Sequence, residues 1–220
     1  MATIVIGSVP ADEFALNHTL DEFPEMRFES EQIIKSGDEA VMPLLWARNT
    51  SGQDLQCVLE SDPTVGDVTS LAAFDDEVLY RMEWTGHIRL LLQMLTNSEG
   101  TILDAYGRDD EWRLRVLFPT RDRFSSTHDF CEEHGLTFEI DSIREMEGQP
   151  SGRYGLTDGQ YEALVTATRQ GYYDIPQEKT LEELADELGV SHQALSEQLR
   201  RGNRSLIEDT LLVGAPHDLR

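Results

Sequence analysis

The segment from Thr180 to Arg201 carries the pattern that most limits how this chain can fold. Thr180 and Glu183 are spaced as a capping box, in which each side chain accepts a hydrogen bond from a backbone amide at the start of a helix. Gly189 stands where a left-handed residue ends a helix at little cost, and Ser191 can cap a second helix. Between these signals, helical spacing is kept by the apolar residues Leu181, Leu184, Ala185 and Leu188. We therefore predict two helices joined by a tight glycine turn.

The second of these helices is predicted to present a polar face outward, because Leu195 and Leu199 lie four residues apart and face inward. This is the pattern of a helix-turn-helix DNA-binding module, although an ordinary helical hairpin with a solvated face shares it. Gln can pair with adenine, Arg with guanine, and Glu can accept from cytosine N4. We expect the helix from Ser191 to Arg201 to read bases near its start and to contact phosphates near its end. The predicted DNA-binding residues are Thr180, Ser191, Glu197, Arg200, Arg201 and Arg204, together with the leading base readers His192, Gln193 and Ser196.

Further helices are predicted on both sides of this pair. Thr157 and Gln160 form another capping pair, followed by an inner face of Tyr161, Leu164, Val165 and Thr168. After Arg204, a separate last helix is predicted from the stripe of Leu206, Ile207, Thr210 and Leu211. That helix either closes the small core or pairs with a second subunit. We therefore place an all-α helix-turn-helix domain at residues 156–213 and a frayed tail at 214–220.

Residues 1–147 alternate between strand-like and helical patterns. Strands are expected at 2–7, 27–34, 41–47, 65–71, 78–84, 101–106, 112–118 and 136–140, and helices at 11–20, 53–59, 88–95 and 124–131. This order is strand-helix-strand-strand-helix-strand, twice over. We predict an α+β domain of two tandem ferredoxin-like (βαββαβ) units, with a single larger sheet as the alternative. Glycine and proline mark a linker at 148–155.

Several blocks of sequence resemble the C-terminal domain of the haloarchaeal bacterio-opsin activator family of transcription regulators. They are LTDGQYEALVTA, GYYDIP, TLEELADELGVS, and LRRG followed by LIEDTLL. Five further blocks resemble the domain that precedes this module in the family, namely MPLLWAR, DPTV, LYRMEW, LRVLFP and HDFCEEHG. The resemblance implies a DNA-binding transcription regulator of a halophilic archaeon. Larger members carry PAS or GAF sensory domains upstream, and 220 residues leave no length for one, so the likeness is to a short form.

The chain is strongly acidic, and nearly all of its basic residues are arginines. Eighteen Lys and Arg stand against 42 Asp and Glu, a net charge of −24, and only two cations are lysines. Neither the part from Ser151 onward (−5) nor the part before it (−19) is basic, so the usual electrostatic footprint of a DNA-binding protein is missing. At about 1 M salt, however, the Debye length is near 3 Å, and distant carboxylates scarcely repel phosphate. We expect binding through close contacts and dimeric avidity, with a shallow salt dependence.

Candidate chemical sites are few. His128, Cys131 and His134 are three residues apart and drift around a helix, so packing explains them better than a metal, with redox sensing by Cys131 as an alternative. An anionic ligand could bind Arg81, Arg113 and Arg115, although pairing with nearby carboxylates is the simpler interpretation. No phosphate loop, GxSxG motif or distinct pair of catalytic carboxylates is present, so we predict no enzyme, no cofactor and no metal.

The sequence therefore predicts a sequence-specific regulator that binds double-stranded DNA as a homodimer. Its N-terminal domain is expected to dimerise and to sense a small-molecule effector or a partner. The alternative is an acidic protein-interaction module that contacts the basal transcription machinery and binds DNA weakly. The absence of a signal peptide and of any long apolar run predicts a cytoplasmic location without membrane contact, and two distant cysteines favour a reducing interior.

Overall fold

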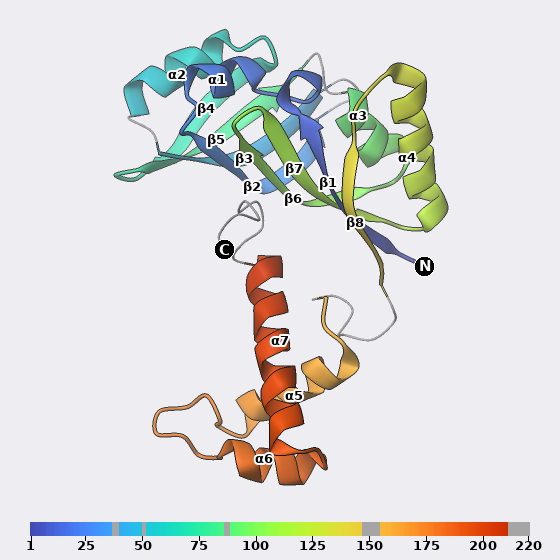
Figure 1. The fold of residues 1–220 in the computed structure, drawn as a ribbon. Coiled ribbons are helices and arrows are strands. Elements are labelled where there is room, and N and C mark those ends of the chain that lie inside the picture. The colour runs from blue at the N-terminus through green and yellow to red at the C-terminus, as the bar shows by residue number, and fades with distance from the viewer. Residues whose placement is uncertain (37–39, 50–51, 86–88, 147–154, 211–220) are drawn as a thin grey trace. The chain divides into compact units, whose positions relative to one another are not determined.

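The computed structural model describes residues 1–36, 40–49, 52–85, 89–146 and 155–210 (Figure 1). The chain divides into two compact units, Met1–Glu145 and Met146–Arg220, called here the N-terminal unit and the C-terminal unit. The linker predicted at 148–155 and the tail predicted at 214–220 fall almost entirely outside the described residues. Within the described ranges, no helix is both long enough and apolar enough to cross a bilayer.

The N-terminal unit contains the predicted series of strands and helices. Its elements are β1 (Thr3–Pro10), the 3-10 turn Ala11–Glu13, α1 (Asn17–Glu22), β2 (Arg27–Ser36), β3 (Ala40–Arg48), α2 (Gly52–Ser61), β4 (Val65–Ala73), β5 (Glu77–Trp84), α3 (Arg89–Leu92), the π-helical segment Gln93–Asn97, β6 (Thr101–Arg108), β7 (Glu111–Phe118), α4 (Arg121–His134) and β8 (Glu139–Glu145). The strand predicted at 136–140 is displaced, because Gly135 ends α4 in the left-handed conformation and the chain turns before pairing begins at Glu139.

The eight strands form one antiparallel sheet in the order β4-β5-β3-β2-β6-β7-β1-β8. The α+β class is therefore confirmed, but neither half of the unit builds a ferredoxin-like sheet from its own four strands. The first strands are exchanged: β5 lies between β4 and β3, and β1 lies between β7 and β8. The two halves join through β2 and β6. The single-sheet alternative thus describes the hydrogen bonding, and the tandem pattern survives only in the order of the elements.

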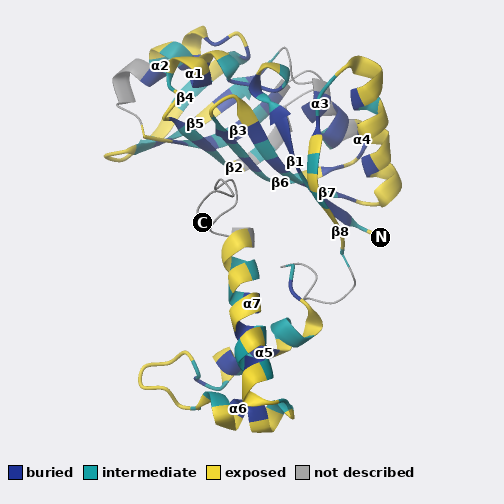
Figure 2. Cartoon of the chain, in the orientation of Figure 1, coloured by how far each residue is buried: buried dark blue, intermediate teal, exposed yellow. Residues whose placement is uncertain are grey.

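The helices cover one face of this sheet, and the core lies between the two layers (Figures 1 and 2). The predicted alternation in β7 is observed, with Trp112, Leu114, Val116 and Phe118 fully buried. The Trp112 ring meets Trp84 edge-on with centroids 5.3 Å apart, and its Nε1 donates to the Ala15 carbonyl at 2.7 Å. A side chain at Gly107 would place its Cβ 2.8 Å from the Trp112 ring, so the packing requires glycine there.

A buried carboxylate organises the start of α1. Asp62 is 2% exposed, and its Oδ2 accepts from the backbone N (3.0 Å) and the hydroxyl (2.7 Å) of Thr19. Its Oδ1 accepts from the backbone N and hydroxyl of Thr64, and the Thr64 hydroxyl accepts from the Leu16 amide. These bonds explain why the helix predicted at 11–20 is divided: Leu16 adopts a left-handed φ of 60°, and α1 begins after it.

The C-terminal unit contains α5 (Asp158–Arg169), α6 (Leu181–Leu188) and α7 (His192–Thr210). Its core is made of Leu156, Ala163, Leu164, Ala167, Leu184, Ala185, Leu195 and Leu199. The separate last helix predicted after Arg204 is wrong, because α7 continues without a break from the recognition segment. Gly202 is buried within it, and a Cβ there would lie 2.7 Å from Leu164 Cδ1. Close approach of α5 and α7 thus offsets the roughly 1 kcal/mol by which glycine weakens a helix.

Candidate nucleic-acid interface

The turn between α6 and α7 is built as the sequence predicted. Thr180 Oγ1 accepts from the Glu183 amide, and Glu183 Oε2 accepts from the Thr180 amide at 2.8 Å. Gly189 ends α6 with a left-handed φ of 67°. The Ser191 hydroxyl accepts from the Ala194 amide at 3.1 Å and so caps α7. The hydroxyls of Thr180 and Ser191 are therefore occupied in capping, and these residues position α7.

Replacing Thr180 by alanine should destabilise the C-terminal unit by about 1 kcal/mol, because an N-terminal cap of α6 is lost. The backbone hydrogen bond from Thr180 lowers the pKa of Glu183, and the Thr180 hydroxyl adds to this effect. A lowered folded-state pKa gives stability that is present above the ordinary pKa of the carboxyl and is lost as pH falls through the lowered value. In thermal unfolding, both proteins should therefore lose stability in acid, and the difference between them should narrow only by the share of the Thr180 hydroxyl, because alanine keeps the backbone amide that Glu183 accepts from. A variant as stable as wild type at neutral pH would contradict this account.

The polar face predicted for α7 lies on the outside of the C-terminal unit. His192, Gln193, Glu197, Arg200, Arg201 and Arg204 are exposed, and Ser196 is half-buried. On the opposite side of the helix, Leu195 is fully buried and Leu199 is 5% exposed. The core thus holds α7 by its leucines and leaves its polar side chains accessible, as insertion into a major groove requires.

Hydrogen bonds along α7 already engage part of this face. Glu197 accepts from Gln193 Nε2 at 3.4 Å and from Arg201 Nη2 at 3.2 Å. Arg204 donates to Glu208 at 2.7 Å, and this hydrogen bond raises the pKa of the Arg204 guanidinium. Arg200 has no ion pair with any residue that the structure describes. An outside contact by Gln193, Arg201 or Arg204 would therefore replace an intrahelical bond, whereas Arg200 has none to give up.

The arginines proposed from the sequence as an anion site do not come together. Arg113 and Arg115 lie on β7, whereas Arg81 lies on β5, and β3, β2 and β6 stand between these strands. At about 4.8 Å per strand the separation is close to 19 Å. Arg113 pairs with Asp141 at 3.1 Å, and Arg115 pairs with Asp104 at 3.5 Å. Arg113 and Arg115 are therefore paired with carboxylates, as the simpler interpretation predicts.

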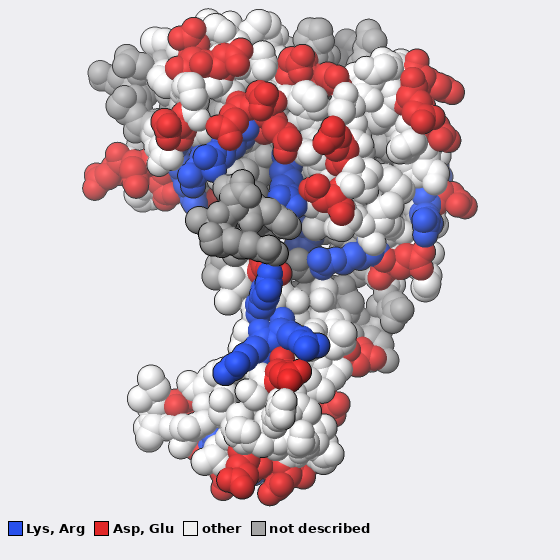
Figure 3. All heavy atoms as spheres, viewed as in Figure 1, with Lys and Arg blue, Asp and Glu red and all other residues white. Residues whose placement is uncertain are grey.

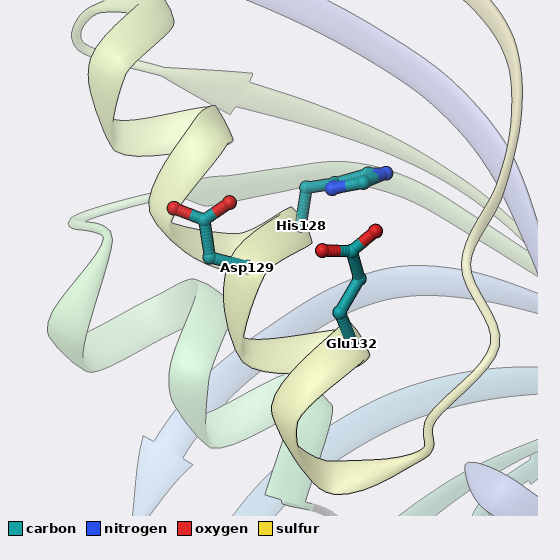
Figure 4. A group of neighbouring side chains, drawn as sticks. All are labelled: His128, Asp129 and Glu132. Carbon is teal, nitrogen blue, oxygen red and sulfur yellow. The ribbon is translucent and has the colours of Figure 1, made fainter.

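The cysteine and histidines of α4 point apart. Cys131 is 5% exposed, and burial, followed by the charge of Glu13, raises the pKa of its thiol to about 11. Redox-active cysteines have lowered pKa values, so the redox alternative gains no support. A different group does gather here: ligand atoms of His128, Asp129 and Glu132 lie within 4.8 Å of one another (Figure 4). All three are exposed, and His128 and Glu132 are one turn apart on the same helix, as solvated surface groups commonly are.

Comparison with known proteins finds two family models that together cover most of the chain. Residues 156–208 match the HTH DNA binding domain HTH_10, and residues 8–156 match BAT, the GAF and HTH_10 associated domain. A Haloferax volcanii protein named as the dimethyl sulfoxide reductase transcriptional activator is 28% identical over 147 residues, which is 66% of this chain and 62% of that protein. Another protein of that organism, provisionally named a transcriptional regulator, is 47% identical over 53 residues, 24% of this chain and 9% of its own length. The chain thus spans less than two thirds of either relative.

Proposed function

We propose that the chain regulates transcription by reading specific DNA sequences with α7, because it belongs to the family in which a GAF- and HTH_10-associated domain precedes an HTH_10 DNA-binding domain. The membership confirms the resemblance to haloarchaeal activators of the bacterio-opsin type, and it indicates a regulator and not an enzyme. The match to an HTH DNA binding domain supports DNA binding, and double-stranded DNA is the partner proposed. A cytoplasmic location accords with that partner.

One observation carries the proposal: α7 exposes its polar residues while its leucines fill the core of the C-terminal unit. His192, Gln193 and Ser196 occupy the first two turns, where base edges are read. Glu197 lies beside them and can accept from cytosine N4. Arg200, Arg201 and Arg204 follow on the next turns, where guanidinium groups contact phosphates. The reading segment from Ser191 to Arg201 is thus the first part of a longer helix, and Thr180 and Ser191 act by fixing its direction.

Assembly and sensing complete the proposal. A single short helix contacts few base pairs, so two copies reading two half-sites would raise both affinity and specificity. Half-sites should be about 10 base pairs apart, or a multiple of this spacing. The N-terminal unit, with residues 1–147, is proposed to hold the dimer together and to sense a ligand or partner. The C-terminal module of residues 156–213 is proposed to carry the DNA contacts.

Footprinting of genomic fragments in molar KCl should show two protected half-sites, and affinity should change little between about 1 and 2 M KCl. At this salt concentration the repulsion between the protein's carboxylates and the DNA phosphates is screened beyond about 3 Å, and few counterions are released on binding. A fragment of the same length and base composition but shuffled sequence is the control. Binding that vanishes between these two salt concentrations, or that is equal on the shuffled fragment, would contradict the proposal.

A second candidate function has one observation in its favour. The loop between α5 and α6 exposes Ile175 completely and Tyr173 by 45%, next to the carboxylate of Asp174. An apolar tip beside acidic groups suits a protein surface and not a phosphate backbone. Under this alternative the chain contacts the basal transcription machinery, and footprinting would show no sequence-selective protection. Acidic side chains are also prominent on the face seen in Figure 3.

A further inference from the structure

Three arginines stand side by side on the face of the sheet that the helices leave open. The backbone register places Arg27 of β2 opposite Arg48 of β3 on one side and opposite Arg108 of β6 on the other. We call these three residues the arginine row. Because Phe28, Ala47 and Gly107 are buried against the helices, their sequence neighbours in the row face the other way. Figure 3 shows basic side chains gathered on this side of the N-terminal unit and acidic ones over the helices.

Such a row is unfavourable unless anions offset it. Like charges directly opposite one another across neighbouring strands destabilise a sheet. The part of the chain before Ser151 has 30 Asp and Glu for 11 Lys and Arg, so a shortage of carboxylates does not explain the arrangement. Two members of the row do have partners. Arg48 pairs with Glu29 at 3.1 Å and with Glu77 at 3.2 Å, and Arg108 pairs through Nε with Asp109 at 3.2 Å.

The middle arginine is different. Within the described ranges, no carboxylate pairs with Arg27, and its Nε is shielded from solvent without any hydrogen-bond acceptor. A buried donor without an acceptor is costly, and this one belongs to a cation between two other cations. Arg113 and Arg115, two strands away, differ in that each pairs with an aspartate, although Nε of Arg115 is also buried without an acceptor. An anion from outside the fold would supply the acceptor that Nε of Arg27 lacks.

We propose that the arginine row is a binding site for a compact oxyanion, the carboxylate or phosphate group of a small molecule, held by Arg27 and Arg108. A planar oxyanion can accept two parallel hydrogen bonds from one guanidinium, which is the strong geometry for arginine. Arg108 is the better second donor because Asp109 engages its Nε alone, whereas Glu29 and Glu77 engage both Nη2 and Nε of Arg48. Tyr106 and Trp46 occupy the next positions on the same face of β6 and β3, where they can contact the body of the ligand.

This inference goes beyond DNA reading and does not depend on it. It replaces the separated arginines Arg81, Arg113 and Arg115 with a cluster that the register brings together. It also gives the sensing role of the N-terminal unit a class of effector, a small acid, and a place on the sheet where that effector binds.

The test uses the full chain in KCl buffer at fixed ionic strength, with potassium phosphate and potassium acetate as separate probes. Calorimetry and thermal unfolding should show wild type binding at least one of them, and the stronger probe identifies the ligand as phosphate-like or carboxylate-like. Arg27→Gln should lower that affinity at least tenfold. Without a probe, the same variant should unfold at or above the wild-type temperature, because it removes a cation from between two others and the unpaired donor with it.

Arg81→Gln is the matched control, since it removes one exposed cation of the same sheet on β5. It should bind the probe within twofold of wild type. The inference is overturned if wild type binds neither probe, if Arg27→Gln binds as wild type does, or if Arg81→Gln loses as much affinity. Arg27→Gln that keeps probe binding but loses DNA binding would also overturn it, by assigning Arg27 to DNA phosphate. Failure of the footprint alone contradicts the proposed function and leaves this result standing.

Discussion

Replacing Asp62 by alanine should lower the free energy of unfolding of the N-terminal unit by about 3 kcal/mol or more. The carboxylate accepts from the amide and hydroxyl of Thr19 and from the amide and hydroxyl of Thr64, all in a buried site. Alanine leaves at least two backbone amides without acceptors, and each such buried donor costs roughly 1–3 kcal/mol. Denaturant titration in molar KCl, followed by the fluorescence of the buried Trp84 and Trp112, measures the change.

Two further variants separate the hydrogen bonds from the charge. Asp62→Asn keeps the shape and one carbonyl oxygen, so it should retain part of the network and lose less stability than alanine. Asp67→Ala removes the same charge from an exposed position on β4 and should change stability by less than about 0.5 kcal/mol. If Asp62→Ala and Asp67→Ala unfold at the same denaturant concentration, the buried network does not hold α1 in place.

The C-terminal unit was largely predictable because its signals are local. Both capping boxes, at Thr157 and Thr180, use residues three apart and were found from spacing alone. Gly189 adopts the left-handed conformation expected at the end of α6. The exception is Gly202, because the sequence predicted a separate helix after Arg204 and α7 instead runs unbroken through this glycine. Its lack of a side chain admits Leu164 from α5, and a contact between distant residues cannot be seen in the local pattern.

The arrangement of strands was not predictable for the same reason. The β1 and β5 strands each begin a strand-helix-strand-strand-helix-strand series. Each has buried side chains that suit the core under either half of the sheet, and backbone edges that can hydrogen-bond to strands of either half. Nothing in their local pattern favours the exchanged order over the separate one. Register depends on this choice, and so does the set of side chains that share a face. The sequence therefore gives no sign that Arg27 lies beside Arg48 and Arg108, which are far away along the chain.

Arginines on this protein differ in whether a described carboxylate pairs with them. In about 1 M salt an isolated surface cation gains little from long-range attraction, since the Debye length is near 3 Å. Only a guanidinium that touches its anion can contribute to specificity under these conditions. Arg200 on the polar face of α7 and Arg27 in the middle of the arginine row have no carboxylate paired with them among the described residues. Arg81 and Arg169 share this property but lie outside both sites, which makes them the controls. We expect Arg200 and Arg27 to contact an external anion directly, and their variants to have effects that salt does not mask.

Changing Gln193 and Arg200 together to alanine should weaken binding to the protected DNA site by about a hundredfold or more. The base contact of Gln193 contributes roughly 1–3 kcal/mol of discrimination, the direct phosphate contact of Arg200 adds affinity, and the two residues lie on separate turns of the exposed face of α7. Neither side chain packs in the core formed by Leu195 and Leu199, so the fold should be unchanged by circular dichroism. Fluorescence anisotropy in molar KCl, with specific and shuffled duplexes, measures the loss of selectivity.

Arg169→Ala is the control for charge, because Arg169 is exposed in the last turn of α5 and not on α7. At this salt concentration its removal should change DNA affinity by less than about twofold, since only contacting charges matter. If it weakens binding as much as the α7 variant, attraction by net charge, and not reading by α7, holds the DNA. If the α7 variant binds the specific duplex as wild type does, another surface of the chain reads the sequence, and the assignment of His192, Gln193 and Ser196 as base readers is wrong.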